Sequence, residues 1–207
     1  MTITNEDNMQ LMARYEDNHF DLAIVDPPYG INASEMTMGS GKNKKYKKGK
    51  KWDNETPNLE YFKELQRITK NQIIWGGNYF ADKLKPSRCY IFWDKGINGD
   101  CDFADGELAW CSFNKVLRIA PIRYKGFLGA DNVRIHPTQK PVKLYEWLLM
   151  NYAKEGDKIL DTNLGSGSIA IASHNLGYDL TACELDKDYY EAAIKRINQH
   201  KAQLRII

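Results

Sequence analysis

The sequence Phe20-Asp21-Leu22-Ala23-Ile24-Val25-Asp26-Pro27-Pro28-Tyr29 joins a short apolar run to two consecutive prolines. The run over residues 20–25 predicts a buried strand. The prolines end it, because Pro28 has no N–H and each proline disfavours helix in the residue before it. We expect a stiff turn that holds the Asp26 carboxylate, the Pro27 carbonyl and the Tyr29 ring at the carboxyl end of the strand. Ligands of open α/β sheets bind at that end.

These groups suit an exocyclic amine on a flat heterocycle. The two N–H groups of such an amine need two acceptors, which the Asp26 carboxylate and the Pro27 carbonyl supply, and the ring needs an aromatic face, which Tyr29 supplies. The alternative is a buried strand that ends in a plain Pro-Pro turn with a solvated aspartate. Four residues do not decide between the two, because short motifs give false positives.

Length and composition predict a single domain of 207 residues, 43% of them hydrophobic. The net charge of +2 does not by itself indicate a polyanionic partner. The four cysteines form no Cys-x-x-Cys pair, which favours reduced thiols in a cytoplasmic protein over disulfides or zinc, and we expect no metal. Residues 1–7 lack the features of a signal peptide, and no apolar run approaches the length of a membrane span.

A dense basic run follows the Pro-Pro turn, and it predicts a mobile loop over residues 30–52. A solvated charged loop is the plain interpretation. The position directly after Asp26 favours instead a loop that grips phosphates and orders on nucleic acid. Arg123 and Lys125 lie in a second basic and aromatic stretch, which suits nucleic acid but is equally common on ordinary surfaces. The lysines of the first run are Lys42, Lys44, Lys45, Lys47, Lys48, Lys50 and Lys51.

Hydrophobic spacing predicts the other elements. Helices are expected over residues 6–17, 58–70, 78–84, 141–153, the residues after 168, and 186–199. Strands are expected at 72–75, 89–93, 157–161 and 178–183. Residues 107–113 and 116–119 are expected to pair with each other around Asn114-Lys115.

Residues 157–184 follow the order strand, glycine-rich turn, helix, strand, carboxylate, which is typical of nucleoside-binding βαβ units. Gly165 and Gly167 let the backbone approach a ligand, and Glu184 follows Asp161 at about the 20-residue spacing of a ribose-binding acid. Asp161 would repel a pyrophosphate but suits a cationic ligand. The pattern favours S-adenosylmethionine over a dinucleotide. The alternative is a generic α/β turn with surface carboxylates.

Four motifs in this order resemble those of the β-class amino-DNA methyltransferases, which methylate adenine N6 or cytosine N4. They are Asp26-Pro27-Pro28-Tyr29, His136-Pro137-Thr138-Gln139-Lys140-Pro141, the stretch from Asp161 to Gly167, and Glu184-Leu185-Asp186. The resemblance covers nearly the whole chain and is weakest over 95–135. It implies one α/β methyltransferase domain over 1–207, with a Rossmann-like, circularly permuted sheet and a small target-recognition region at 95–135.

The resemblance also implies roles for individual residues. The catalytic turn would be Asp26 to Tyr29, and the Thr138-Gln139-Lys140 loop would hold the methionine end of the cofactor. Glu184 would bind the ribose hydroxyls. The remaining cofactor-binding residues would be Asp161, Asn163, Gly165, Ser166, Gly167 and Leu185. One departure is that Thr162-Asn163 stands where the family has Pro-Phe, with its aromatic cofactor contact.

The resemblance thus predicts methyl transfer to N6 of an adenine flipped out of double-stranded DNA, with restriction-modification as one setting. Within the family, Asp in the first motif position goes more often with adenine and Ser with cytosine. Cytosine N4 remains the alternative. RNA and protein amides are weaker ones, and a catalytically silent nucleic-acid-binding module is the alternative of another class. No cysteine lies beside the motif, so attack on the ring by a thiolate is not expected. The small recognition region favours a homodimer.

Overall fold

The structure is a computed structural model that describes residues 1–33, 53–96, 104–122 and 135–203. Its strands are β1 (Thr2–Thr4), β2 (Phe20–Val25), β3 (Thr69–Trp75), β4 (Cys89–Asp94), β5 (Gly106–Cys111), β6 (Arg118–Ala120), β7 (Lys158–Asp161) and β8 (Asp179–Cys183). Its helices are α1 (Asn8–Met12), α2 (Leu59–Ile68), the 3-10 helix η1 (Gly77–Phe80), α3 (Val142–Tyr152), α4 (Ser168–Leu176) and α5 (Lys187–Lys201).

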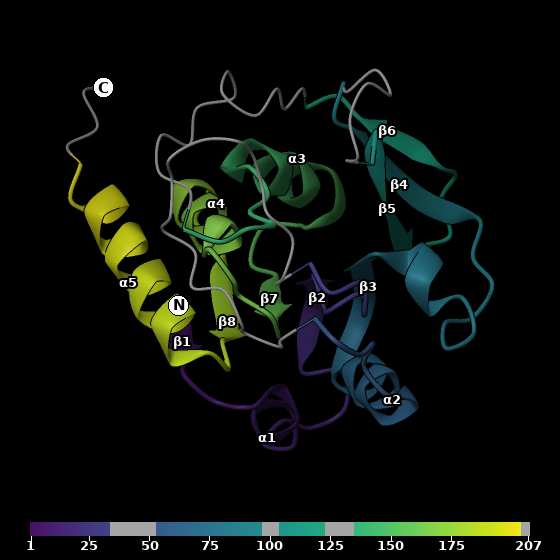
Figure 1. Ribbon diagram of the computed structural model, residues 1–207, viewed down its shortest axis with the longest axis horizontal. Coiled ribbons are helices and arrows are strands. Elements are labelled where there is room, and N and C mark those ends of the chain that lie inside the picture. The colour runs from purple at the N-terminus through teal and green to yellow at the C-terminus, as the bar shows by residue number, and fades with distance from the viewer. Residues whose placement is uncertain (34–52, 97–103, 123–134, 204–207) are drawn as a thin grey trace.

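Within those residues, eight strands form one mixed sheet in the order β1-β8-β7-β2-β3-β5-β4-β6, with helices on both faces (Figure 1). The predicted α/β sheet is therefore confirmed. Strand β2 lies in the middle because its apolar residues are buried on both faces. Leu22 and Ile24 pack into the core with α3, α4 and α5, while Ala23 and Val25 pack into the core with α1 and α2.

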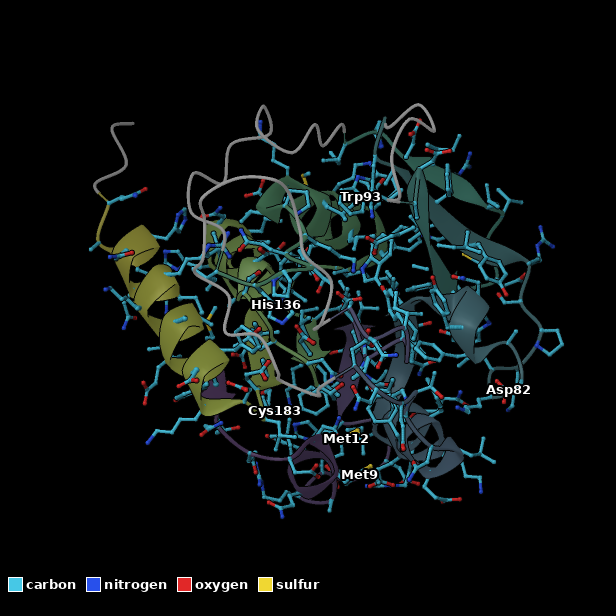
Figure 2. All side chains as sticks on the ribbon, in the orientation of Figure 1. Met9, Met12, Asp82, Trp93, His136 and Cys183 are labelled. Atoms are coloured by element: carbon cyan, nitrogen blue, oxygen red, sulfur yellow. The ribbon has the colours of Figure 1, made fainter. Side chains whose placement is uncertain are left out.

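The second of these cores lies under α1 and α2. Met12 is fully buried there, together with Cys183 and with Phe62 of α2. Met9, Met12 and Cys183 are labelled near one another in Figure 2, where α1 packs beneath the sheet. With helices closing both sides, the functional groups of the central strands are left at the ends of the strands.

The strand order reverses at the β2–β7 pair, because β3 is added on one side of β2 whereas β7 and β8 are added on the other. Strand β2 pairs in parallel with both β3 and β7, and from there one half of the sheet continues to β6 and the other to β1. A crevice opens at the carboxyl ends of strands at such a reversal point, where ligands bind in open α/β sheets. Asp26 follows β2 and Asp161 ends β7, so the two motifs flank this crevice.

The predicted pairing of residues 107–113 with 116–119 is wrong. Strand β5 is hydrogen-bonded along one edge to β3 and along the other to β4, both antiparallel, so it has no free edge for β6. Strand β6 instead pairs in parallel with the outer edge of β4, where Arg118 is the partner of Ile91. This arrangement places the start of β5 at the same edge of the sheet as the end of β2.

Several predicted boundaries shift. The helix expected over 6–17 is confined to α1, where the Asp7 carboxylate caps the N–H groups of Met9 and Gln10. The predicted Asn58 cap of α2 is confirmed, since its side chain accepts from Tyr61 N. Strand β1 was not predicted, and it extends the sheet beyond β8. No helix in the described ranges is long and apolar enough to cross a membrane.

Candidate active site

The Asp26 carboxylate is bonded on both oxygens. Its Oδ1 accepts a hydrogen bond from the Tyr29 hydroxyl at 2.6 Å, and its Oδ2 accepts one from Lys140 Nζ at 2.6 Å. The side chain is 18% exposed. Because an ionised carboxylate has about four lone-pair sites, two donors leave capacity for a further N–H. Asp26 can therefore accept from a ligand without losing its present partners.

Lys140 joins Asp26 to a second carboxylate that sequence reasoning did not single out. Its ammonium lies 2.8 Å from Glu107 Oε2, and Glu107 Oε1 lies 2.7 Å from Lys95 Nζ. The Lys140 side chain is only 2% exposed. We call Asp26, Lys140, Glu107 and Lys95 the ionic chain. The structure thus places Lys140 against the Asp-Pro-Pro-Tyr turn, and its expected role at the methionine end of a cofactor stays a prediction.

Burial and charge oppose each other along the ionic chain. Burial raises the pKa of Asp26, and Lys140 offsets only part of that rise. Burial would by itself raise the pKa of Glu107, but Lys140 and Lys95 outweigh it and bring that pKa to about 2. Burial would lower the pKa of Lys140, but the two carboxylates outweigh it and raise that pKa. Lys140 and Glu107 are therefore charged at neutral pH.

The Tyr29 ring lies on a platform formed by the residues after β3. It stacks on Tyr79 with ring centroids 4.9 Å apart and an interplanar angle of 15°. Gly76 leaves the room for this, because a Cβ there would lie 2.3 Å from Tyr29 Cε1. Gly76 also has a φ of +73°, which glycine adopts without strain. Tyr79 and Gly76 were not predicted, although the Gly76-Gly77 pair marks the end of β3.

Asp53 fixes the backbone that follows the Asp-Pro-Pro-Tyr motif. Its buried carboxylate accepts from the N–H groups of Tyr29 at 2.6 Å, Gly30 at 2.9 Å and Ala33 at 2.8 Å. The sequence carries no local signal for this role, because Asp53 lies 24 residues beyond Tyr29. The turn is thus held by a residue that is distant from it in the sequence.

A cavity of about 220 Å³ opens beside the same turn. Pro28 of the turn contributes to its wall, as do Thr162, Asn163 and Glu184 of the predicted cofactor half. The other lining residues are Glu6, Asp7, Asn8, Glu55, Thr56, Pro57 and Leu185. Sequence reasoning missed Glu6 and Asp7, because it did not recognise β1 and so could not place the residues that follow it at this edge.

The glycine turn between β7 and α4 is fixed by Glu184. Its Oε2 accepts from Gly165 N at 2.8 Å and its Oε1 accepts from Asp186 N at 2.9 Å. Gly165 and Gly167 have φ values of +53° and +74°, which favour glycine. Arg196 of α5 donates to the carbonyl of Ser166 at 2.8 Å. The predicted cofactor residues around this turn are therefore brought together, although Gly165 and Glu184 are already bonded to each other.

Tyr61 supports the turn where the family pattern would have Pro-Phe. Its buried hydroxyl lies 2.7 Å from Thr162 Oγ1 and 3.3 Å from Asn163 Oδ1. Burial raises the pKa of Asp161 to about 8 against the hydrogen bond from Asn163 N, and the charge of Asp26 adds to the rise. Asp26 and Asp161 therefore influence each other across the crevice.

The loop before α3 lies between the two halves of the site. The His136 ring (labelled in Figure 2) packs against Tyr189 of α5 with ring centroids 4.4 Å apart. A Cβ at Gly165 would lie 3.9 Å from His136 Cδ2, so the ring also lies beside the glycine turn. Thr138 Oγ1 lies 3.1 Å from His136 Nδ1, and Gln139 Oε1 accepts from Ile135 N at 3.1 Å. The loop thus contacts the glycine turn through His136 and Asp26 through Lys140.

The cavity suits a cationic nucleoside. Four carboxylates line it, those of Glu6, Asp7, Glu55 and Glu184, and of these Glu6 is already paired with Arg14 through both of its oxygens. Pro28 and the 70% exposed Leu185 add apolar surface. Carboxylates favour a cation over a phosphate, and apolar walls suit a flat base. These residues therefore fit S-adenosylmethionine, which carries an ammonium, a sulfonium and an adenosine.

The predicted DNA-binding residues lie outside the described part of the chain. This holds for Lys42, Lys44, Lys45, Lys47, Lys48, Lys50, Lys51, Arg123 and Lys125, and for most of the predicted loop over 30–52. Of the predicted recognition region over 95–135, the described residues 106–111 and 118–120 are strands of the central sheet. Its recognition role stays a prediction.

We expect Asp53→Ala to lower the free energy of unfolding by about 2 kcal/mol or more, because it leaves three backbone donors without their acceptor. Urea unfolding followed by circular dichroism measures the change. Asp82→Ala is the matched control, since Asp82 is exposed (labelled in Figure 2) and should change stability by less than about 0.5 kcal/mol. Equal losses in the two variants would contradict the assignment of Asp53 to this turn.

Comparisons with known proteins show which proteins the chain is similar to. Residues 110–195 match the family model for N6/N4 methyltransferases, described as DNA methylase. The type II methyltransferase M2.DpnII of Streptococcus pneumoniae is 40% identical over 62 residues, which are 30% of this chain and 23% of that protein. M2.LlaDCHI of Lactococcus lactis subsp. cremoris is 38% identical over 64 residues, 31% of this chain and 24% of that protein. The matched segment thus spans about a quarter of these relatives.

Solved structures extend the similarity to the whole chain at the level of the fold. The complex of M1.HpyAVI with SAM superposes with a TM-score of 0.63 at 20% identity, covering 94% of this chain and 98% of that one. The cytosine-N4-specific PvuII DNA methyltransferase gives a TM-score of 0.60 at 11% identity, covering 99% and 87%. The chain therefore has the fold of these methyltransferases, and its residues 110–195 are similar in sequence to the N6/N4 DNA methyltransferase family.

Proposed function

We propose that the chain is an S-adenosylmethionine-dependent DNA methyltransferase that acts on the exocyclic N6 of a flipped-out adenine. One observation carries the proposal: Pro28 of the Asp-Pro-Pro-Tyr turn and Glu184 of the glycine-turn half line the same cavity. A group that accepts amine N–H bonds and a pocket that suits a cationic nucleoside therefore lie side by side at the reversal point of the sheet.

The cofactor would be held by residues whose positions are fixed by the fold. Both Glu184 oxygens accept backbone N–H groups, from Gly165 and from Asp186, and the remaining lone-pair capacity of the carboxylate would bind the ribose hydroxyls. Leu185 would cover the adenine with apolar surface. Gly165 and Gly167 leave the backbone free of side chains at the closest approach. The chemistry supplied by S-adenosylmethionine is an electrophilic methyl group on a sulfonium. Asp161, Asn163, Ser166 and the Thr138-Gln139-Lys140 loop would complete this set.

The acceptor base would be held by the catalytic turn. The remaining capacity of the Asp26 carboxylate accepts one amino N–H, and the Pro27 carbonyl accepts the other, which orients the nitrogen lone pair out of the plane of the base. Asp26 then holds the proton that the nitrogen gives up, either as a base or as the first acceptor on its way to solvent. Alignment and electrostatics supply most of the rate, and no covalent enzyme intermediate is needed.

Double-stranded DNA is the proposed partner, because the homologous type II methyltransferases and the matched family are DNA enzymes by name. The lysines of residues 42–51, with Arg123 and Lys125, would neutralise phosphates, and the 95–135 region would contact the target sequence. The same proposal includes a permuted motif order over one domain, a small recognition region, a homodimer and a restriction-modification setting.

Adenine is preferred to cytosine because the first motif residue is Asp26, which goes more often with adenine in this family. The fold does not discriminate between the bases, since PvuII DNA methyltransferase is cytosine-N4-specific and shares it at 11% identity. A catalytically silent DNA-binding module would keep the fold as well. The intact constellation of Asp26, Tyr29, Gly165 and Glu184 argues against such a module.

We expect Asp26→Asn and Glu184→Gln to separate the two halves of the site. Asp26→Asn should lower methyl transfer to DNA by about 100-fold or more while S-adenosylmethionine affinity stays within a few-fold, because Asp26 contacts the base. Glu184→Gln should weaken the affinity, measured by isothermal titration calorimetry. Near-normal transfer by Asp26→Asn, with the radioactive methyl group counted in DNA, would show that Asp26 is misassigned.

Tyr29 is expected to act through its ring. Tyr29→Phe should keep turnover within about threefold, whereas Tyr29→Ala should lose about tenfold or more, because stacking on a base contributes roughly 1–3 kcal/mol. Tyr79→Phe, which keeps the ring beneath Tyr29, is the matched control. Losses of the same size in Tyr29→Phe and Tyr29→Ala would assign the contribution to the hydroxyl that donates to Asp26.

A further inference from the structure

We propose that Lys140 and Glu107 are positioning residues for the methyl acceptor: Lys140 holds the Asp26 carboxylate ionised and in one orientation, and Glu107 holds Lys140 in place beside it. This inference rests on the proposed function and deepens it. Glu107 carries no assignment from the sequence motifs, and the motif containing Lys140 implies a different contact. The structure instead shows both in one chain of ion pairs that ends on the catalytic turn.

Three separate elements converge to make this arrangement. Asp26 follows β2, Lys140 precedes α3, and Glu107 is the second residue of β5. Because β5 runs antiparallel to β3, its first residues lie at the same edge of the sheet as the carboxyl end of β2. The contact between Lys140 and Asp26 spans 114 residues of sequence. Such a convergence is a property of the fold rather than of a local turn.

The Lys140 ammonium uses its three N–H groups on three oxygens. It lies 2.6 Å from Asp26 Oδ2, 2.8 Å from Glu107 Oε2 and 3.3 Å from the Tyr29 hydroxyl. An ammonium has three donors and no acceptor, so this set satisfies it completely. The geometry holds Asp26 Oδ2 at a fixed position while the second lone pair of each oxygen stays available.

Glu107 has a different task from Lys140. A buried ammonium bound to Asp26 alone could move together with that carboxylate. Glu107 binds Lys140 from the other side and so fixes the position of the Lys140 ammonium. Lys95 then balances Glu107 at 2.7 Å, so the two carboxylates and two ammonium groups are neutral as a set. Neutrality matters because an uncompensated charge at this depth would be costly.

Other titratable groups face Asp26 as well, and they act in known directions. Tyr29 donates to it, and Asp161 across the crevice is a like charge when ionised. Among the described residues, the groups whose charge interacts with that of Asp26 are Tyr29, Glu107, Lys140, Asp161, Tyr145 of α3 and Tyr61 of α2. In this set Lys140 is a cation and Glu107, which is bonded to it, is an anion. Removing Lys140 should therefore raise the pKa of Asp26, and removing Glu107 should lower it.

The test compares the pH dependence of single-turnover methyl transfer, from pH 5 to 9, in the wild-type chain, Lys140→Met and Glu107→Gln. Transfer requires ionised Asp26, so the rate falls as the pH drops through the pKa of Asp26. Lys140→Met removes a cation and should move this acid limb up by about one pH unit or more. Glu107→Gln removes an anion and should move it down. Lys143→Met is the control, because Lys143 is exposed and lies in the first turn of α3, just after the loop that carries Lys140.

The outcomes separate the inference from the proposed function. Absence of transfer by the wild-type chain would overturn the proposed function. Transfer by the wild-type chain, with no shift or with shifts in the same direction in the two variants, would overturn only the inference. If Lys140→Met does not fold, as judged by circular dichroism, Glu107→Gln decides alone. In the folded Glu107→Gln variant, S-adenosylmethionine affinity should stay within about twofold of wild type, because Glu107 is not among the proposed cofactor residues, and a larger loss of affinity would overturn the inference.

Discussion

The ion pair between Asp26 and Lys140 is the contact on which the rest of the site depends. A carboxylate at the end of a buried strand needs a partner to stay ionised, and the partner comes from a loop 114 residues away. The sheet makes this possible, because β2 and β7 lie side by side and direct the Asp-Pro-Pro-Tyr turn and the glycine turn to one edge. Burial of Lys140 in turn requires Glu107, and the antiparallel β5 provides it.

The same edge also carries the cavity proposed to bind the cofactor, and its carboxylates are held in a different way. Glu184 accepts backbone N–H groups from Gly165 and Asp186, and Asp7 accepts them from the first turn of α1. Backbone donors orient these acids without cancelling their charge, so the cavity stays acidic. The ionic chain beside it is neutral as a set. A cationic cofactor and a neutral base would thus meet two different electrostatic environments that share the Pro28 wall.

Local chemistry made much of the fold and site predictable. Apolar runs indicated β2, β3, β4, β7 and β8, and the motif order anticipated that the Asp-Pro-Pro-Tyr turn and Glu184 lie at the same edge of the sheet. The missing parts depend on contacts between distant segments. The pairing of β6 with β4 follows from both edges of β5 being occupied, and β1 is only three residues long. Asp53 and Glu107 are ordinary acids in sequence, and only the folded chain shows what they bind.

The most direct test of the central claim is the identity of the methylated nucleoside. Double-stranded DNA incubated with the protein and isotopically labelled S-adenosylmethionine is digested to nucleosides and analysed by mass spectrometry, with Asp26→Asn as the control. We predict labelled N6-methyladenine that is absent from the control. Labelled N4-methylcytosine would keep the site chemistry and correct the base. DNA without label, from protein that binds S-adenosylmethionine, would contradict the account.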